Sequence, residues 1–179
     1  MKKIIFVCIL LWSTPSIAQI RSATLVASGL TCSMCSKAIF KALEAVPSVK
    51  AVDVDIERSS YAIAFKDGAT ISLDEIKAAV ENAGFFVASL QVTASFTQTK
   101  VANDTHLELG GSVFHFVNVP EQVVNGEKTI TVIDKDFLPA KDRKKYTKHT
   151  KLTCFETGHA AACCPGGADA QKRIYHVTI

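Results

Sequence analysis

The sequence has no hydrophobic run long enough to span a membrane and no strong excess of charge of one sign. The apolar stretch Ile4 to Trp12 is about half the roughly 20 residues that a spanning helix needs, and no later segment is long and apolar enough. The formal net charge of +3 gives no reason to expect nucleic acid as a partner. Ser-His-Asp patterns, paired carboxylates and phosphate-binding glycine loops are also missing from the second half, so no enzyme activity is expected.

The first 18 residues have the pattern of a secretory signal peptide. Lys2 and Lys3 precede the apolar stretch, and Ser16-Ile17-Ala18 offers small residues for cleavage after Ala18. A membrane anchor is the alternative, but the stretch is short for one. Removal of this segment takes away two lysines, so the net charge falls from +3 to 3 − 2 = +1. We therefore expect a periplasmic or secreted protein with no integral membrane segment.

An odd number of cysteines remains after this cleavage. One of the six, Cys8, lies within the signal peptide. The five that remain are Cys32, Cys35, Cys154, Cys163 and Cys164. Because five thiols cannot all pair within one chain, at least one must be free, bound to metal or joined to another molecule.

Residues 22–92 predict a domain with the element order β-α-β-β-α-β. The expected strands are residues 23–28, 52–56, 61–65 and 85–92, and the expected helices run to about residue 46 and from residue 72 to residue 84. Pro47 ends the first helix, and Ser72-Leu73-Asp74-Glu75 is a capping box for the second. This order is the ferredoxin-like arrangement, an α+β fold.

The rest of the chain follows a different pattern. Residues 93–105 are polar and predict a linker or an extension of the last strand. Residues 106–179 predict a second, β-rich domain, a small barrel or sandwich for which the OB type is a candidate. Its expected elements are strands at residues 113–119, 129–133 and 175–179, a turn at Asn125-Gly126 and a short basic helix within residues 140–151.

The segment Cys32-Ser33-Met34-Cys35 lies between the first expected strand and the first expected helix. The free N–H groups and the positive dipole end of that helix favour thiolate over thiol. Two thiolates three positions apart can bind one ion, and soft thiolates prefer soft cations such as Cu(I). No His, Asp or Glu lies inside the loop to complete the four-ligand shell of Zn(II). The loop therefore predicts a site for a two-coordinate soft ion, or for an ion that takes a further ligand from a partner.

The sequence Gly29-Leu30-Thr31-Cys32-x-x-Cys35, followed by the βαββαβ pattern to Val92, resembles the heavy-metal-associated domain family. That family includes copper chaperones, modules of metal-transporting P-type ATPases and periplasmic mercury-binding proteins. A bare CxxC is a weak signal, but at this junction of this fold it is strong. The resemblance covers about the first half of the mature chain.

The resemblance implies that Cys32 and Cys35 are the metal ligands. It assigns supporting roles in the loop to Gly29, Thr31 and Phe85. Met34 could add a thioether ligand, but a methionine at a helix start more often packs against its neighbours. Leu30 stands where the family usually has methionine, as a core residue rather than a ligand. The implied function is the capture and transfer of Cu(I), with Hg(II) or Zn(II) as alternatives. The ion would be exchanged with the cysteines of a metal-donating or metal-accepting partner such as a transporter.

Three other interpretations of the protein remain open. An oxidising compartment permits a plain disulfide between Cys32 and Cys35. A thioredoxin-like redox motif is a second alternative, although it normally faces a cis-proline, and Pro47, at a helix end, is the only proline of this domain. In a third, the β-rich half binds a partner and the first domain only senses metal.

A second cluster gathers cysteines and a histidine near the C-terminus. Its members are Cys154, His159, Cys163 and Cys164. The segment is rich in Gly and Ala and packs little core, so either a disulfide from Cys154 or a second metal site is expected to order it. A second site could exchange its ion with the first loop. The remaining histidines, His106, His115, His149 and His176, are expected in ordinary core or surface roles.

Overall fold

The computed structural model describes residues 19–30, 33–162, 164 and 172–179. The strands in this part of the chain are β1 (Ile20–Ser28), β2 (Val49–Asp55), β3 (Ser60–Phe65), β4 (Phe86–Val101), β5 (His106–Leu109), β6 (Ser112–Phe116), β7 (Gln122–Val132) and β8 (Ile174–Thr178). The helices are α1 (Ser33–Glu44), α2 (Leu73–Asn82), α3 (Ala140–Arg143) and α4 (Cys154–Thr157). The expected α+β class is confirmed, and the expected signal peptide lies outside the described residues.

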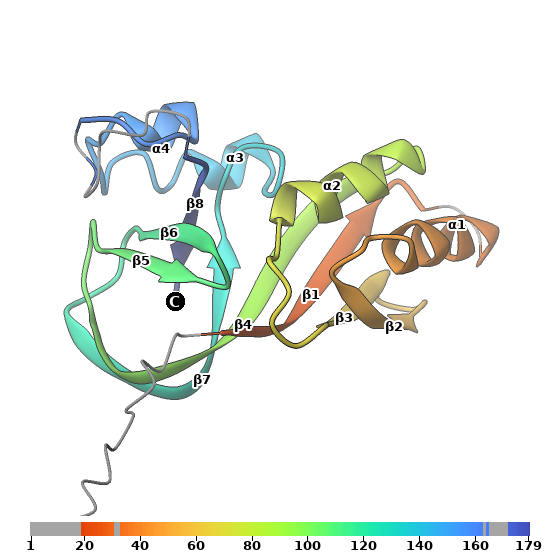
Figure 1. The fold of residues 1–179 in the computed structure, drawn as a ribbon. Coiled ribbons are helices and arrows are strands. Elements are labelled where there is room, and N and C mark those ends of the chain that lie inside the picture. Colours follow the sequence, from red (N-terminus) through yellow and green to blue (C-terminus); the bar gives the residue numbers. More distant parts are fainter. Residues whose placement is uncertain (1–18, 31–32, 163, 165–171) are drawn as a thin grey trace, which may run out of the picture.

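The strands described form one sheet in the order β2-β3-β1-β4-β7-β8-β6-β5. Elements β1 to β4 with α1 and α2 make up its first half, in which β1 pairs antiparallel with both β3 and β4. Both helices lie on one face of this half (Figure 1). Their apolar stripes, which include Ile39, Leu43, Ile76 and Val80, are fully buried against the sheet. This is the expected ferredoxin-like arrangement, because two amphipathic helices can cover one face of a four-stranded sheet.

Strand β4 passes from the first half of the sheet into the second. Its earlier residues pair with β1, and its later residues pair with β7 as far as Val101 (Figure 1). Of the two expectations for residues 93–105, the extension of the last strand is confirmed for residues 93–101, and the linker is wrong there. The polarity of this stretch has a simple cause, since alternate residues such as Ala94 and Phe96 are buried while their neighbours face outward.

The expected turn at Asn125-Gly126 is also wrong, because both residues lie inside β7. Opposite them, Thr97 and Gln98 of β4 face Asn125 alone, which is a β-bulge. Gly126 has φ +73° and Gln98 has φ +43°, and the Gln98 N–H donates to Asn125 Oδ1 at 3.2 Å. A β-bulge, like a turn, needs residues that accept positive φ. The Asn-Gly sequence therefore does mark an irregular backbone, but here it lies in a bulge between two paired strands and not in a turn.

The second half of the sheet contains β7, β8, β6 and β5. Strand β8 pairs antiparallel with β7 and parallel with β6. The expected strands at residues 113–119, 129–133 and 175–179 correspond to β6, the end of β7 and β8, whereas β5 was not expected. No strand pairing among the described residues closes this half into a barrel, so the OB type stays a prediction. No helix in the described part of the chain is long and apolar enough to cross a membrane.

The two halves are joined by a polar cluster as well as by β4. Arg173 Nε donates to Asp74 Oδ2 at 2.8 Å, and Arg173 Nη2 lies 3.1 Å from Asp134 Oδ2. The Tyr175 hydroxyl donates to Asp74 Oδ2 at 3.1 Å. Asp74 belongs to the first turn of α2, and Arg173 directly precedes β8. The ion pair therefore connects α2 in the first half with the last strand in the second half. The largest hydrophobic cluster of the described residues includes side chains of both halves, and two smaller clusters lie in the second half.

Candidate metal sites

The first candidate site is the loop between β1 and α1. Cys35 lies in the first turn of α1 and is half-buried, whereas Thr31 and Cys32 lie outside the described residues. The first turn of α1 contains no acidic residue, so nothing there opposes the positive end of the helix dipole. The helix start therefore favours a thiolate at position 35.

The α2–β4 connection places an aromatic ring beside this loop. The Gly84 N–H donates to Glu81 O and the Phe85 N–H donates to Val80 O, with Gly84 at φ +89°. These two bonds form a Schellman motif, which ends α2 and fixes the direction of Phe85. A Cβ at Gly29 would lie 3.9 Å from the Phe85 ring, so the ring lies against the backbone at the start of the loop.

Apolar side chains border the loop in two different ways. Leu30 packs against the hydrophobic core, in the position of the core residue that the sequence predicted. Met34 and Phe86, in contrast, are 71% and 68% exposed. Phe86 pairs with Ser28, the last residue of β1, so both exposed side chains lie next to the loop. We call Met34 and Phe86 the loop rim.

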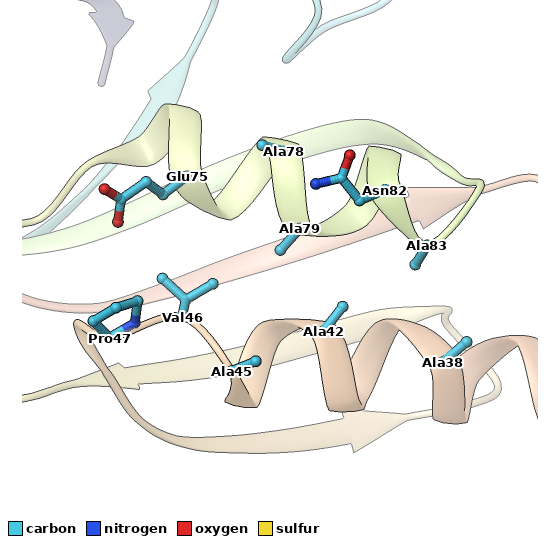
Figure 2. A pocket seen from close by; sticks show the side chains of 10 residues that line it. All are labelled: Ala38, Ala42, Ala45, Val46, Pro47, Glu75, Ala78, Ala79, Asn82 and Ala83. Atoms are coloured by element: carbon cyan, nitrogen blue, oxygen red, sulfur yellow. The ribbon is translucent and has the colours of Figure 1, made fainter.

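A groove of about 520 Å³ lies between α1 and α2. Figure 2 shows that it is lined mainly by alanines, with Glu75 and Asn82 as its polar members. A lone carboxylate and an amide do not make a metal-binding or catalytic set. The groove results from small residues on facing helices and adds nothing to the metal chemistry of the loop.

The second candidate site lies in the β-rich half, with a membership different from the predicted one. His159 is exposed, its Nδ1 lies 2.9 Å from the Thr157 carbonyl, and it does not belong to the group of possible ligand atoms around Cys154. Cys164 is buried in the same apolar cluster as Cys154 and Ile174. Cys163 lies outside the described residues. Of the predicted members of the second site, Cys154 and Cys164 therefore lie in one cluster, and His159 does not belong to it.

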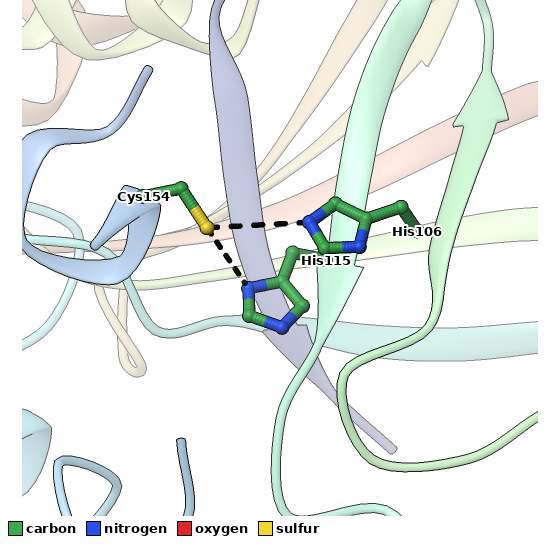
Figure 3. A group of neighbouring side chains, drawn as sticks. All are labelled: His106, His115 and Cys154. Carbon is green, nitrogen blue, oxygen red and sulfur yellow. Dashed lines mark hydrogen bonds between the residues drawn. The ribbon is translucent and has the colours of Figure 1, made fainter. Parts of the chain in front are cut away.

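Two histidines that were expected in ordinary core or surface roles lie next to Cys154 instead. The Cys154 Sγ lies 3.7 Å from His115 Nδ1 and 4.0 Å from His106 Nε2 (Figure 3). The ligand atoms of these three residues all lie within 4.8 Å of one another. We call His106, His115 and Cys154 the His-Cys cluster.

The sequence did contain a signal that His106 and His115 lie opposite each other. Gly110 and Gly111, with φ +57° and +82°, form a two-residue connection between β5 and β6. A hairpin centred on Gly-Gly places His106 directly opposite His115, and the rings stack with centroids 4.3 Å apart. Position 154 comes from α4, and no local pattern connects it with the hairpin.

Burial keeps both imidazoles of the cluster neutral near pH 7. Desolvation is the main cause that lowers the pKa of His115 to about 4, and it also lowers the pKa of His106. A hydrogen bond to Asp104 opposes this shift in His115 but does not overcome it. Neutral imidazole is the form that binds metal ions.

A cysteine-bearing loop at the β1–α1 junction of a ferredoxin-like fold defines a class of small metal-binding modules. Residues 24–86 match the heavy-metal-associated domain, and through these residues the chain belongs to that family. No curated protein matches the chain.

Solved structures with similarity to the chain cover little more than a third of its length. The yeast copper transporter domain is 28% identical over 36% of this chain and 88% of its own, with a TM-score of 0.33. Oxidized MerP from Ralstonia metallidurans is 30% identical over 38% of this chain and 94% of its own, with a TM-score of 0.35. Apo-CopP from Helicobacter pylori is 30% identical over 37% and 98%, with a TM-score of 0.33. The β-rich half lies outside the family match.

Proposed function

We propose that this protein captures a soft metal ion, Cu(I) in the first place, through Cys32 and Cys35 and transfers it to a partner. The observation that carries the proposal is the heavy-metal-associated domain at residues 24–86, with Cys35 in the first turn of α1. Capture and transfer need ligands and an accessible site, and they need no catalytic group.

The donor set supports Cu(I) over Zn(II). The loop offers two cysteines and no His, Asp or Glu, and soft thiolates select soft ions. A Zn(II) ion would lack the four ligands that its structural sites have. Hg(II) is also thiophilic, so a mercury-binding role is the alternative within the same class of protein.

The loop rim supports transfer rather than storage. Exposed apolar side chains next to a site favour contact with another protein. A partner that contacts Met34 and Phe86 would bring its own cysteines to the open coordination sphere of the ion. The partner would be a metal donor or acceptor, such as a transporter, and the purpose would be metal homeostasis or detoxification.

The test is an anaerobic Cu(I) titration of the reduced mature protein against a competing chelator. Replacement of Cys32 and Cys35 by serine is expected to lower the affinity of the loop by at least about 100-fold, since hydroxyls are poor ligands for soft ions. The matched control is Ser36→Ala, which changes a buried neighbour on α1 and leaves both thiols. The double variant should also bind one Cu(I) fewer per chain than the wild type, and an unchanged number of bound ions would exclude the loop as a copper site.

The same variants separate the redox alternative. A thiol–disulfide protein would exchange electrons with a dithiol substrate through Cys32 and Cys35 and would bind Cu(I) no more tightly than the serine variant. A preference for Hg(II) over Cu(I) in the wild-type loop would instead favour the mercury-binding role.

Export to the periplasm is part of the proposal. It rests on Lys2, Lys3, the apolar stretch and the small residues before Gln19. Expression of the full chain in a bacterium is expected to give a shortened protein in the periplasmic fraction that begins at Gln19, as amino-terminal sequencing would show. Replacement of Ala18 by a bulky residue such as Phe should block the shortening. A full-length chain in the cytoplasm would contradict the proposal.

A further inference from the structure

We propose that His106, His115 and Cys154 form a second metal site, which binds a copper ion in the β-rich half of the protein. The site is independent of the first loop and lies outside the region that matches the heavy-metal-associated domain. Three observations support it, namely the direction of the ring nitrogens, the distances between the ligand atoms and the way in which the fold fixes them.

The first observation is that Asp104 orients both imidazoles. His106 Nδ1 lies 3.2 Å from the Asp104 backbone carbonyl, and His115 Nε2 lies 2.9 Å from the Asp104 carboxylate. Both oxygens are acceptors, so each of these nitrogens carries the proton. The other nitrogen of each ring, His106 Nε2 and His115 Nδ1, is then the one that can donate a lone pair to a metal ion, and these are the two nitrogens that face Cys154 Sγ. Carboxylate and carbonyl partners of this kind are the usual outer contacts of metal-binding histidines.

The second observation is the spacing of the ligand atoms. A metal ion about 2.0 Å from nitrogen and about 2.3 Å from sulfur separates the two by about 3.6–3.8 Å. The measured sulfur–nitrogen distances are 3.7 and 4.0 Å. The two nitrogens lie within 4.8 Å of each other, against about 3.5 Å in a trigonal site, so the ligand atoms would have to approach by up to about 1.3 Å to surround one ion.

The third observation is that rigid elements fix the ligands. His106 and His115 are a directly opposed pair in the β5–β6 hairpin, and β6 is paired with β8 on its other side. Cys154 begins α4 and has no exposed surface. Asp104 has φ +63°, and its N–H donates to the Phe116 carbonyl at 2.8 Å, which ties it to the end of the same hairpin. Ligands held on paired strands need little reorganisation on binding.

The donor set favours copper. Imidazole suits copper and zinc alike, thiolate suits Cu(I) and zinc, and a trigonal set of two histidines and one cysteine is characteristic of copper. Zinc would need a fourth ligand. The nearest thiol of the described residues is that of Cys164, which is buried in the same apolar cluster but lies outside the three-ligand group.

A thiol hydrolase is the rival interpretation, because Cys154, His115 and Asp104 also lie in a row. A nucleophile must reach its substrate, yet Cys154 is 0% exposed. A second imidazole faces the same sulfur, and a hydrolase has no use for it. An ion, in contrast, needs only a narrow route. A pocket of about 240 Å³ is lined by His106 and Cys164, so it reaches one member of the cluster.

The experiment uses the mature protein with Cys32 and Cys35 replaced by serine, so that the first loop cannot contribute. Anaerobic titration with Cu(I) is expected to give about one tightly bound ion per chain. His106→Gln should lower the affinity by about 100-fold, and His106 is the least buried of the three ligands, so the fold tolerates the change best. The matched control is His159→Gln, an exposed histidine that the sequence had favoured as a ligand, and it should leave the affinity unchanged.

X-ray absorption is measured on the copper-loaded protein in which Cys32 and Cys35 are serine and the His-Cys cluster is intact. Its answer does not depend on any variant within the cluster. The expected shell has about two nitrogen donors near 2.0 Å and about one sulfur near 2.3 Å. A shell of sulfur alone would assign the ion to the carboxy-terminal cysteines and overturn the proposal. So would a loss of affinity in His159→Gln, or tighter binding of Zn(II) than of copper. If the proposed second site is refuted, the proposed copper site in the first loop is not affected, because that site is tested in a protein whose His-Cys cluster is intact.

Discussion

Replacement of Asp104 by glycine is expected to weaken copper binding at the His-Cys cluster by about 10–100-fold. Asp104 accepts hydrogen bonds from both imidazoles, through its carboxylate and through its backbone carbonyl. Glycine accepts φ +63° without strain and keeps the carbonyl, so the variant removes the carboxylate and little else. His115 then loses the contact that fixes which of its nitrogens carries the proton. The affinity is measured by chelator competition with Cys32 and Cys35 replaced by serine.

Two further variants make this prediction specific. Asp104→Asn tolerates positive φ and keeps an oxygen acceptor, so it should lie between the wild type and the glycine variant. Asp136→Gly also removes an aspartate at positive φ, but Asp136 contacts neither histidine and should leave copper binding unchanged. Equal affinity in the wild type and in Asp104→Gly would show that the carboxylate does not orient a ligand.

Replacement of Arg173 by leucine is expected to destabilise the protein by about 2–3 kcal/mol. Arg173 pairs with Asp74 at the start of α2 and with Asp134, which is only 3% exposed. Its Nη1 also donates to the Gly158 carbonyl at 3.0 Å. Among the described residues, leucine would leave the buried Asp134 carboxylate with His176 as its side-chain partner, at 2.6 Å. The free energy of unfolding in urea is the measurement.

An exposed arginine provides the control for this loss. Arg58 has a side chain that is 84% exposed and pairs with Asp55 three positions earlier, at 3.8 Å. Such a surface pair contributes roughly 0–1 kcal/mol, so Arg58→Leu should change stability little. If Arg173→Leu were no more destabilising than Arg58→Leu, the polar cluster would not hold the two halves together.

The first half of the fold could be predicted because its signals are local. Pro47 ends a helix, the Ser72 hydroxyl accepts from the Glu75 N–H as a capping box requires, and alternation marks the strands. Cys35 could be assigned to a helix start for the same reason. These rules need only a few neighbouring residues, and tertiary contacts in this half agree with them.

The His-Cys cluster could not be predicted as a unit, because pairing between distant residues creates it. His106 and His115 meet through strand pairing, and Cys154 reaches them from α4, 39 positions beyond His115. His159 looked the better ligand because it is close to Cys154 in sequence, yet its Nδ1 is turned to the Thr157 carbonyl. The Gly110-Gly111 turn would have revealed half of the cluster. The burial that lowers the histidine pKa values depends on the whole sheet.

The length of β4 determines how the two sites communicate. The strand begins at Phe86 in the loop rim and ends at Val101, three positions before Asp104, so the sites lie at opposite ends of the sheet (Figure 1). Its 16 residues have a contour of about 50 Å, and because the strand bends along its course (Figure 1), this contour is an upper limit to the separation of its two ends. The two sites share no ligand, so an ion must leave one site before it enters the other. Exchange between the sites of two molecules requires a collision, so the rate of that route follows second-order kinetics and rises with protein concentration.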